Sequence, residues 1–433
     1  MKSRIEVGRG TLKVAIPELG IDSTVDVDRD TLAASFGRGE PLGVDNLIVA
    51  SAVFALDRLV PRWTAPDAWT RSFDVSIPVS ELGSWNAISS DLAAALRFLT
   101  GDSWRLHFAR RSKDPFESEY RSKKLRVADV GVSQLFSGGL DSYAAAISTL
   151  NSSAAPVLLI GHQDQPGAPA AQARLVARFE GHSRYQGRAH LRTIRLGPSG
   201  HGLRESSSRS RSLLFIALDL YAVRALGLSF PVIVPENGFI AINPPLTLAR
   251  LGASSTRTTH PHFIASLQEV WRKVGIDHVI QNPWELQTKG ELLASCSDVS
   301  LLLAGAADSV SCAHAGRRAH WVRREARNCG YCWPCLIRRA SLHHVNSDHG
   351  HEYGLDVLRG ELPLHRASAA DMRALLAALR NDHSDHEIRA RVLLAGPLPG
   401  DRVRYLDVVK RGLAELRKWV SAGGTELRRL ITS

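Results

Sequence analysis

The chain has 433 residues, of which 44% are hydrophobic and 22% charged, a globular composition that excludes a largely disordered protein. No apolar run reaches the length of a membrane span and residues 1–8 lack the core of a signal peptide, so we expect a soluble cytoplasmic protein without membrane contact. The net charge of +11 suits a nucleotide, an acidic partner protein or nucleic acid, but the scattered basic residues require none of them.

Residues 1–125 read as a mixed α+β domain of unknown role, since the length exceeds one ordinary hydrophobic core. Apolar stretches lie near Leu12–Ile16, Phe73–Ile77 and Trp104–Phe108, and helical patterns near Asn46–Leu59 and Asp91–Leu99. The polar stretch Arg110–Lys124 is a candidate linker.

Residues 126–348 alternate between strand and helix patterns. Strands are predicted at Val130–Phe136, Pro156–Ile160, Leu191–Leu196 and Val232–Val234, and helices at Tyr143–Leu150, Ala168–Glu180 and Arg211–Leu226. This alternation predicts an α/β fold, a parallel sheet with helices on both faces, whose ligands bind beyond the carboxyl ends of the strands. Residues 349–433 are predicted to be helical, as at Ala369–Leu379 and Tyr405–Trp419.

The segment Ser137-Gly-Gly-Leu-Asp-Ser142 follows the first of these strands and precedes a helix. Gly138 and Gly139 allow a tight bend and a close approach to a phosphate, and the following N–H groups point at the anion. Ser137 and Ser142 offer hydroxyl donors, while Asp141 can cap the helix or hold Mg²⁺. The alternative is an ordinary glycine turn that is capped by Asp or Ser and binds no ligand. Because the turn ends a strand, truncating its side chains is expected to remove ligand contacts rather than core packing.

Four of the five cysteines lie close together, as Cys312-x16-Cys329-x2-Cys332-x2-Cys335. Four thiolates can close a tetrahedral zinc site without an open position, which indicates a structural metal. His314 is an alternative ligand, and free buried cysteines are the alternative to a metal site. Cys296 is expected to be a buried free thiol.

The combination of SGGxDS with a distal Cys…CGxCxxC knuckle resembles the 7-cyano-7-deazaguanine synthase family, QueC, of the PP-loop ATP pyrophosphatases. Further matching segments are Arg211-Ser-Leu-Leu-Phe215, Thr288-Lys289, Ser311-Cys312 and Cys335-Leu-Ile-Arg338. The resemblance covers about residues 130–345. The long loop between the first two cysteines and the segments Pro235–Gly238 and Ser255–Pro261 depart from the family pattern. With its additional N-terminal region, the chain looks most like the QueC-like components, QatC, of Qat antiphage defence systems.

The resemblance implies that ATP, with Mg²⁺, converts a 7-deazaguanine carboxylate into an acyl adenylate, which an amine then attacks to give an amide. The amine is ammonia in the synthases, and a protein from the same defence operon is the alternative. Lys289, Arg211 and Arg257 are candidates to bind the pyrophosphate, although each also suits a surface cation. His260 is a candidate base or ribose contact, or a plain loop histidine.

Two other functions stay open. Sulfur transfer to nucleic acid is disfavoured because only Cys296 lies outside the cysteine cluster. A non-catalytic scaffold is disfavoured by the intact SGGxDS.

Overall fold

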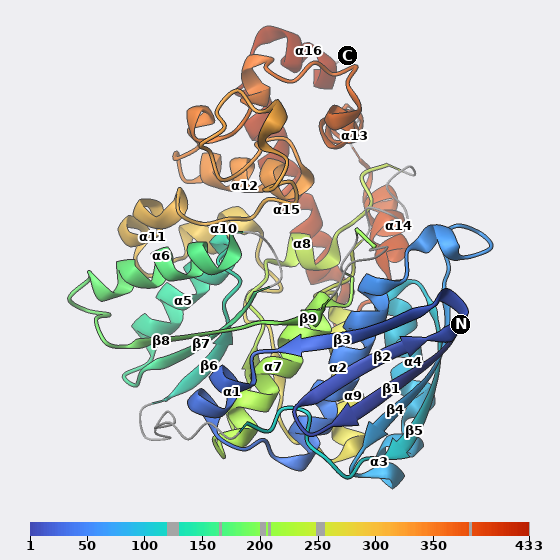
Figure 1. The fold of residues 1–433 in the computed structure, drawn as a ribbon. Coiled ribbons are helices and arrows are strands. Elements are labelled where there is room, and N and C mark those ends of the chain that lie inside the picture. The colour runs from blue at the N-terminus through green and yellow to red at the C-terminus, as the bar shows by residue number, and fades with distance from the viewer. Residues whose placement is uncertain are drawn as a thin grey trace.

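The computed structural model describes residues 1–118, 130–163, 167–199, 205–206, 209–247, 256–380 and 383–432. Within these residues, two β-sheets flank a layer of helices, and a mainly helical region lies above them (Figure 1). The last residues of the predicted linker, 119–124, and Ser255 lie outside the described residues.

The sheet formed by the predicted strand–helix alternation has five described strands, all parallel. Its order is β11 (Ile280–Gln281), β10 (Val232–Ile233), β6 (Val132–Leu135), β7 (Val157–His162) and β8 (Ala189–Ile194). Helices α5 (Leu140–Ser152), α6 (Ala168–Glu180) and α7 (Arg211–Ala225) follow β6, β7 and β9 (Leu196–Pro198).

Both faces of this sheet are covered, which the alternation of side chains along β7 makes clear. Val157 and Leu159 belong to the core formed with α5 and α6. Leu158 and Ile160 belong to the opposite core, formed with α7. The predicted α/β arrangement, a parallel sheet with helices on both faces, is therefore confirmed.

The second sheet has six described strands and mixed directions. Its order is β5 (Ser103–Arg110), β4 (Ser72–Val79), β1 (Lys2–Gly8), β2 (Thr11–Ile16), β3 (Ile21–Val27) and β9. The β1–β4–β5 pairs are parallel, and the β1–β2–β3–β9 pairs are antiparallel. The three apolar stretches noted in residues 1–125 lie in β2, β4 and β5.

The strand predicted at Leu191–Leu196 is two strands in the structure, and this part of the prediction is wrong. The chain leaves the parallel sheet after Ile194 and joins β3 of the other sheet at Leu196. Arg195 lies at the crossing, where its carbonyl accepts a hydrogen bond of 2.9 Å from the Asp28 N–H. The apolar pattern runs through both strands, so it does not show the change of sheet.

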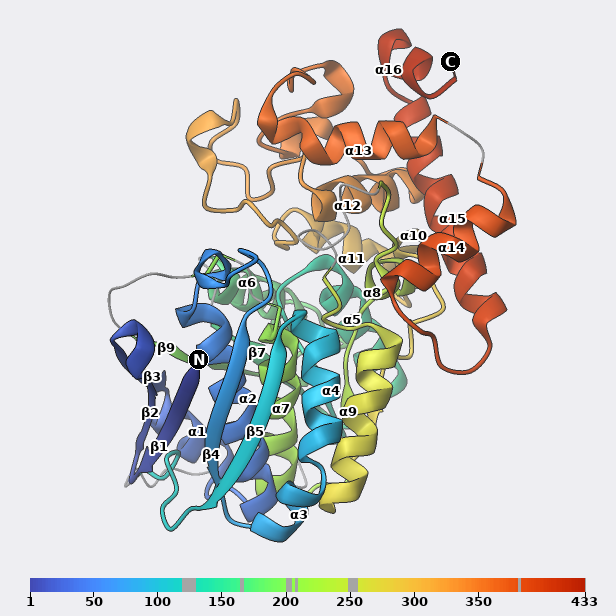
Figure 2. The same cartoon turned by 90° about the vertical axis from the view of Figure 1, so that its right-hand side faces the viewer.

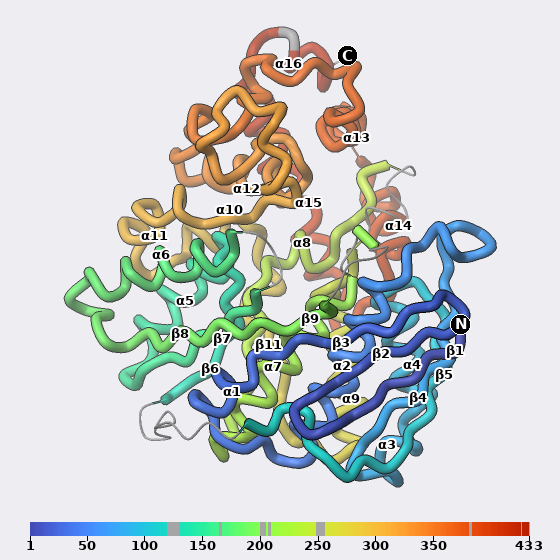
Figure 3. The backbone as a smooth tube through the Cα atoms, in the orientation of Figure 1, coloured from blue at the N-terminus to red at the C-terminus, as the bar shows by residue number. Residues whose placement is uncertain are grey.

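Four helices lie between the two sheets, two from before and two from after the predicted domain boundary at 125/126 (Figures 1 and 3). They are α2 (Pro41–Leu59), α4 (Ser89–Thr100), α7 and α9 (Pro261–Val274). Leu47 and Phe54 of α2 share one buried core with Leu214 of α7. The buried Trp271 indole of α9 donates a hydrogen bond of 3.0 Å to Asn46 of α2.

The region after residue 282 is mainly helical and forms the upper part of Figures 1 and 2. Its helices are α10 (Lys289–Ala294), α11 (Val299–Ala306), α12 (Trp333–His344), α13 (Ala370–Leu379), α14 (Asp385–Ala395), α15 (Arg402–Ser421) and α16 (Thr425–Thr432). Leu336 of α12 and Trp419 of α15 belong to one buried core, which also includes the four clustered cysteines. The remaining α-helices of the described residues are short: α1 (Arg29–Phe36), α3 (Leu82–Ala87) and α8 (Gly238–Ile242). Among the described helices, none has both the length and the apolar character required to cross a bilayer.

One buried carboxyl group makes the stability of this fold depend on pH. Asp219 of α7 is fully buried and hydrogen-bonded to Ser133 of β6, and burial raises its pKa to about 7. An unfolded aspartate has a pKa of about 3.9, so unfolding releases a proton between these values and stability falls as the pH rises from about 4 to about 7. Asp219→Asn is expected to flatten this part of the dependence, as measured by urea unfolding across the range. An unchanged pH profile in the variant would show that Asp219 is not responsible.

Candidate functional site

A cavity of about 310 Å³ lies at the carboxyl ends of β6 and β10, where the glycine turn begins. The turn contributes Ser137, Gly139, Asp141 and Ser142 to its lining. More distant segments contribute Arg211, Glu236, Lys289, Ser311 and Cys312. The parallel sheet thus presents its phosphate-loop candidate at the edge where such sheets bind ligands.

Gly138 has a φ of 80°, a left-handed conformation that glycine adopts without strain. A Cβ atom there would also lie 3.2 Å from Ala171 and Gln172 of α6. After this turn α5 begins at Leu140. Its N-cap residue is Gly139, which has no side chain that could accept a hydrogen bond from the first turn of the helix. The Gly139 N–H donates to Ser137 Oγ at 3.3 Å, and the Leu140 N–H to Ser311 Oγ at 3.2 Å. Both acceptors are neutral hydroxyls on side chains that line the cavity, so a phosphate oxygen can take their place.

Lys289 is the first residue of α10, and the capping of that helix fixes its position. Thr288 and Glu291 form a reciprocal capping box. Glu415 of α15 accepts a hydrogen bond of 3.2 Å from the Gly290 N–H and another from the Thr288 hydroxyl. The C-terminal region therefore holds the start of α10 and the lysine that reaches the cavity.

Asp141 and Lys289 form a buried ion pair across the cavity, with Oδ1 and Nζ 2.9 Å apart and side chains 9% and 3% exposed. Asn237 donates from Nδ2 to Asp141 Oδ2 at 2.7 Å and to Glu236 Oε1 at 3.2 Å. Asp141 does not cap α5, and its side chain is packed rather than exposed on a turn. Its removal would therefore leave a buried cation unpaired, contrary to the expectation from the sequence.

The two carboxyl groups of this cluster differ in charge. Burial opposes ionisation of Asp141, but Lys289 and hydrogen bonds from Glu236 and Asn237 lower its pKa below the ordinary value. Burial and the Asp141 charge raise the pKa of Glu236 well above its ordinary value. Asp141 is thus the carboxylate that faces Lys289, and Glu236 holds a proton.

Glu236 also lines a second cavity of about 260 Å³, next to the first. Ser137, Ser142, Arg211 and Pro235 line both cavities, so the two meet at the glycine turn. Phe215, Val234, Thr258 and Thr259 contribute to the second one alone. A phosphate chain in the first cavity and an attached group in the second would meet at these shared residues.

Arg257 and His260 do not line either cavity. The Arg257 guanidinium lies 4.5 Å from the Phe98 ring centroid and donates to the Phe98 carbonyl at 3.3 Å. His260 is the N-cap of α9, and its Nδ1 accepts the His262 N–H at 3.1 Å. Burial, with help from Arg257, lowers the His260 pKa to about 3, so this ring is neutral and part of the packing.

The four predicted metal ligands come together as a fully buried group, with all sulfurs within 4.8 Å of one another. Cys312 and Cys332 sulfurs are 3.9 Å apart, and those of Cys329 and Cys335 are 3.7 Å apart. A tetrahedral ion about 2.3 Å from each sulfur separates the sulfurs by about 3.8 Å. The group can therefore hold a metal ion such as zinc, whereas His314 contributes only its N–H, to Cys312 at 3.3 Å.

Backbone N–H groups from the Cys-Gly-x-Cys turn support this geometry. Those of Tyr331 and Cys332 donate to Cys329 Sγ at 3.4 and 3.2 Å. Gly330 has a φ of 85°, and a Cβ atom there would lie 2.3 Å from the Leu355 carbonyl oxygen. The knuckle therefore needs a glycine both for its backbone conformation and for space.

Gly330→Ala is expected to lower stability by more than about 2 kcal/mol and to weaken zinc retention, since the left-handed conformation alone costs about 1–2 kcal/mol. Gly360→Ala is the matched control, because Gly360 has a φ of 78° and open space around its Cα. Chemical unfolding and elemental analysis would measure both effects. Equal losses in the two variants would show that the contact with Leu355 has no influence.

The metal group and the glycine turn are joined through residues 306–311. The Val310 N–H donates to the Gly138 carbonyl at 2.9 Å, and Asn328 accepts the Ser311 N–H at 3.0 Å. Arg338 of α12 donates to Ser309 Oγ at 2.7 Å and to the Ala306 carbonyl at 2.5 Å. Folding of the cysteine group thus positions the residues that contact the phosphate-loop candidate.

The sequence analysis noted the segments Pro235–Gly238 and Ser311-Cys312, but it did not place Glu236, Asn237 and Ser311 among the candidate site residues. Glu236 and Asn237 lie three and four residues after the end of β10, at the same sheet edge as the glycine turn, and that position was the available signal. Glu415 gave no such signal, because it lies in a helix far along the chain.

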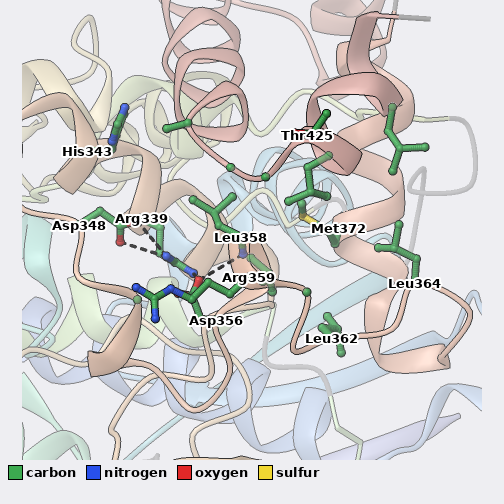
Figure 4. Close-up of a pocket in the computed structure, with 18 of the residues that line it drawn as sticks. Arg339, His343, Asp348, Asp356, Leu358, Arg359, Leu362, Leu364, Met372 and Thr425 are labelled. Atoms are coloured by element: carbon green, nitrogen blue, oxygen red, sulfur yellow. Dashed lines mark hydrogen bonds and ion pairs between the residues drawn. The ribbon is translucent and has the colours of Figure 1, made fainter.

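Another cavity, of about 840 Å³, lies in the C-terminal region and contains none of the predicted site residues (Figure 4). The buried Arg339 guanidinium in its wall is paired with Asp348 at 2.9 Å and with Asp356 at 2.8 Å. Arg359 also pairs with Asp356, at 3.6 Å, so these two cations and two carboxylates neutralise one another. The cavity beside Ser137–Ser142 is therefore the stronger candidate for binding a phosphate.

Comparison of the chain with protein-family models, curated proteins and solved structures gave no match.

Proposed function

We propose that the chain is a PP-loop enzyme of the QueC-like class, which splits ATP into AMP and pyrophosphate in the cavity beside Ser137–Ser142. One observation carries the proposal: the N-terminus of α5, after a left-handed glycine, shares one cavity with Lys289 and Arg211. A helix N-terminus and two cations supply the donors that a departing pyrophosphate requires.

The proposed reaction has two steps. A carboxylate oxygen of a 7-deazaguanine acid attacks the α-phosphorus of ATP, forming an acyl adenylate while pyrophosphate leaves. An amine nitrogen then attacks the acyl carbon, so that the C–N bond forms, the C–O bond to AMP breaks, and a base takes the amine proton. That proton passes to water, because Glu236, whose side chain reaches both cavities, already holds a proton.

Two metals enter the proposal in different roles. Mg²⁺ would accompany the nucleotide and reduce the charge repulsion of the phosphates, and Asp141, the ionised carboxylate of the cavity, is the group that would hold it. Zinc would be structural, because four thiolates leave no open coordination position for a substrate.

The proposed second substrate is an amine on a partner protein from the same defence operon, met in the cytoplasm. The reason is that residues 1–125 and 349–433 add surface that an enzyme acting on ammonia would not need, whereas the two joined cavities, of about 310 and 260 Å³, are lined by residues 135–334 alone. Nucleic acid is not required by this reaction. Synthesis of free 7-cyano-7-deazaguanine and a non-catalytic scaffold are the alternatives.

The test is to incubate the chain with ATP, 7-carboxy-7-deazaguanine and the proteins encoded beside it, and then to weigh the intact proteins. A mass increase on a neighbour that matches an amide-linked deazaguanine, and that requires ATP, is the expected result. Free 7-cyano-7-deazaguanine as the product would favour the synthase, and no product with any neighbour would favour the scaffold.

A further inference from the structure

Positive charge is concentrated in residues 313–327, between the first two cysteines of the metal group. This segment, here called the basic loop, contains five arginines and one glutamate. Arg323 is paired with Glu361 and Arg327 with Asp308. Arg317, Arg318 and Arg324 are exposed, and within the described part of the chain no carboxylate pairs with them.

The basic loop is held in place by contacts with residues 353–361 rather than extending freely. Its Trp321 ring is 3% exposed and packs so closely on Gly354 that a Cβ there would lie 2.4 Å away. The N–H groups of Val322 and Arg323 both donate to the Gly354 carbonyl, at 2.9 and 3.1 Å. A surface that is ordered before binding loses less entropy when a partner docks.

The basic loop also begins at the rim of the candidate site. Cys312 and Ala313 line the cavity beside the glycine turn, and the Arg317 N–H donates to the His314 carbonyl at 2.9 Å. In Figure 2 the golden-orange chain before α12 extends outward from the helices of the upper region. A partner bound there would lie next to the cavity in which the adenylate is proposed to form.

We infer that the basic loop is a docking surface for an acidic segment of the protein that supplies the amine. The inference rests on the proposed function for the identity of that protein. The three arginines that have no carboxylate partner in the described chain fit carboxylate groups, although Arg318 also donates to the Ala315 carbonyl at 3.3 Å. Val322, which is 65% exposed, offers an apolar contact among them. Single-stranded nucleic acid is the weaker fit, because the aromatic rings of Trp321 and Tyr331 are buried and leave no stacking platform for bases.

The probe is a fluorescent peptide of alternating aspartate and leucine residues, with oligothymidylate of the same length as the competing ligand. Binding to the full chain is measured by anisotropy without ATP, at several salt concentrations. The test variant is Arg317→Gln, Arg318→Gln and Arg324→Gln together. The control is Arg4→Gln, Lys13→Gln and Arg105→Gln together, which removes the same charge from exposed positions of the six-stranded sheet.

The test variant is expected to bind the acidic peptide about tenfold more weakly, a loss of about 1.4 kcal/mol shared among three exposed charge contacts. The control variant and the exchange of pyrophosphate into ATP are expected to be unchanged. Equal weakening in both variants, no peptide binding by the parent chain, or preference for oligothymidylate would each overturn the inference. Peptide binding without any pyrophosphate exchange in the parent chain would instead count against the proposed function alone.

Discussion

Cys332→Ser is expected to release zinc and to unfold the upper helical region. Cys332 is 1% exposed, is the N-cap of α12, and donates its N–H to Cys329. The apparent free energy of binding structural zinc is about 10–16 kcal/mol, as large as the stability of a whole domain. The loss would reach the candidate site, because Val310 and Ser311 connect the metal group to the glycine turn.

The control for this variant is Cys296→Ser. Cys296 is also buried, but its sulfur contacts the Ala144 carbonyl at 3.7 Å and lies outside the metal group. Zinc content and the urea midpoint would be measured for both variants. Stoichiometric zinc and an unchanged midpoint in Cys332→Ser would contradict the assignment of these four cysteines.

Asp141→Ala is expected to lower stability by about 3–5 kcal/mol as well as to abolish turnover, because it leaves the Lys289 ammonium buried and unpaired. Adding Lys289→Met removes that charge, so the double variant is expected to be more stable than Asp141→Ala alone and equally inactive. The double-mutant cycle, followed by urea unfolding, measures the coupling of the pair.

Asp74→Ala serves as the surface control. Its ion pair with Arg105 is 31% and 75% exposed on the two sides, so its removal is expected to cost less than about 1 kcal/mol. If Asp141→Ala were no more destabilising than Asp74→Ala, the Asp141–Lys289 ion pair would not contribute to stability as a buried pair does.

The parts of the site that lie close together in sequence could be predicted, because their signals are local. The apolar run Val157–Ile160 indicates a buried strand, and the two glycines after β6 indicate a tight turn beneath a helix N-terminus. The cysteine spacing likewise predicted which sulfurs come together.

The contacts that join distant elements could not be predicted in this way. Lys289 is held by Glu415, which lies 125 positions after Gly290, and it pairs with Asp141 on a different helix. Arg257 and His260 look like site residues in the sequence, but Phe98 of α4 contacts both. These outcomes depend on how α4, α9, α10 and α15 pack, and single-chain periodicity holds no information about that packing.

The central claim is that ATP is split between its α- and β-phosphates after a carboxylate has attacked. The most direct measurement is exchange of radiolabelled pyrophosphate into ATP, with 7-carboxy-7-deazaguanine present and no amine. The account predicts exchange that requires the acid and is lost in Ser137→Ala, whose hydroxyl lies in the cavity beside the α5 N-terminus. Hydrolysis of ATP to ADP and phosphate, with no exchange at any concentration of the acid, would contradict it.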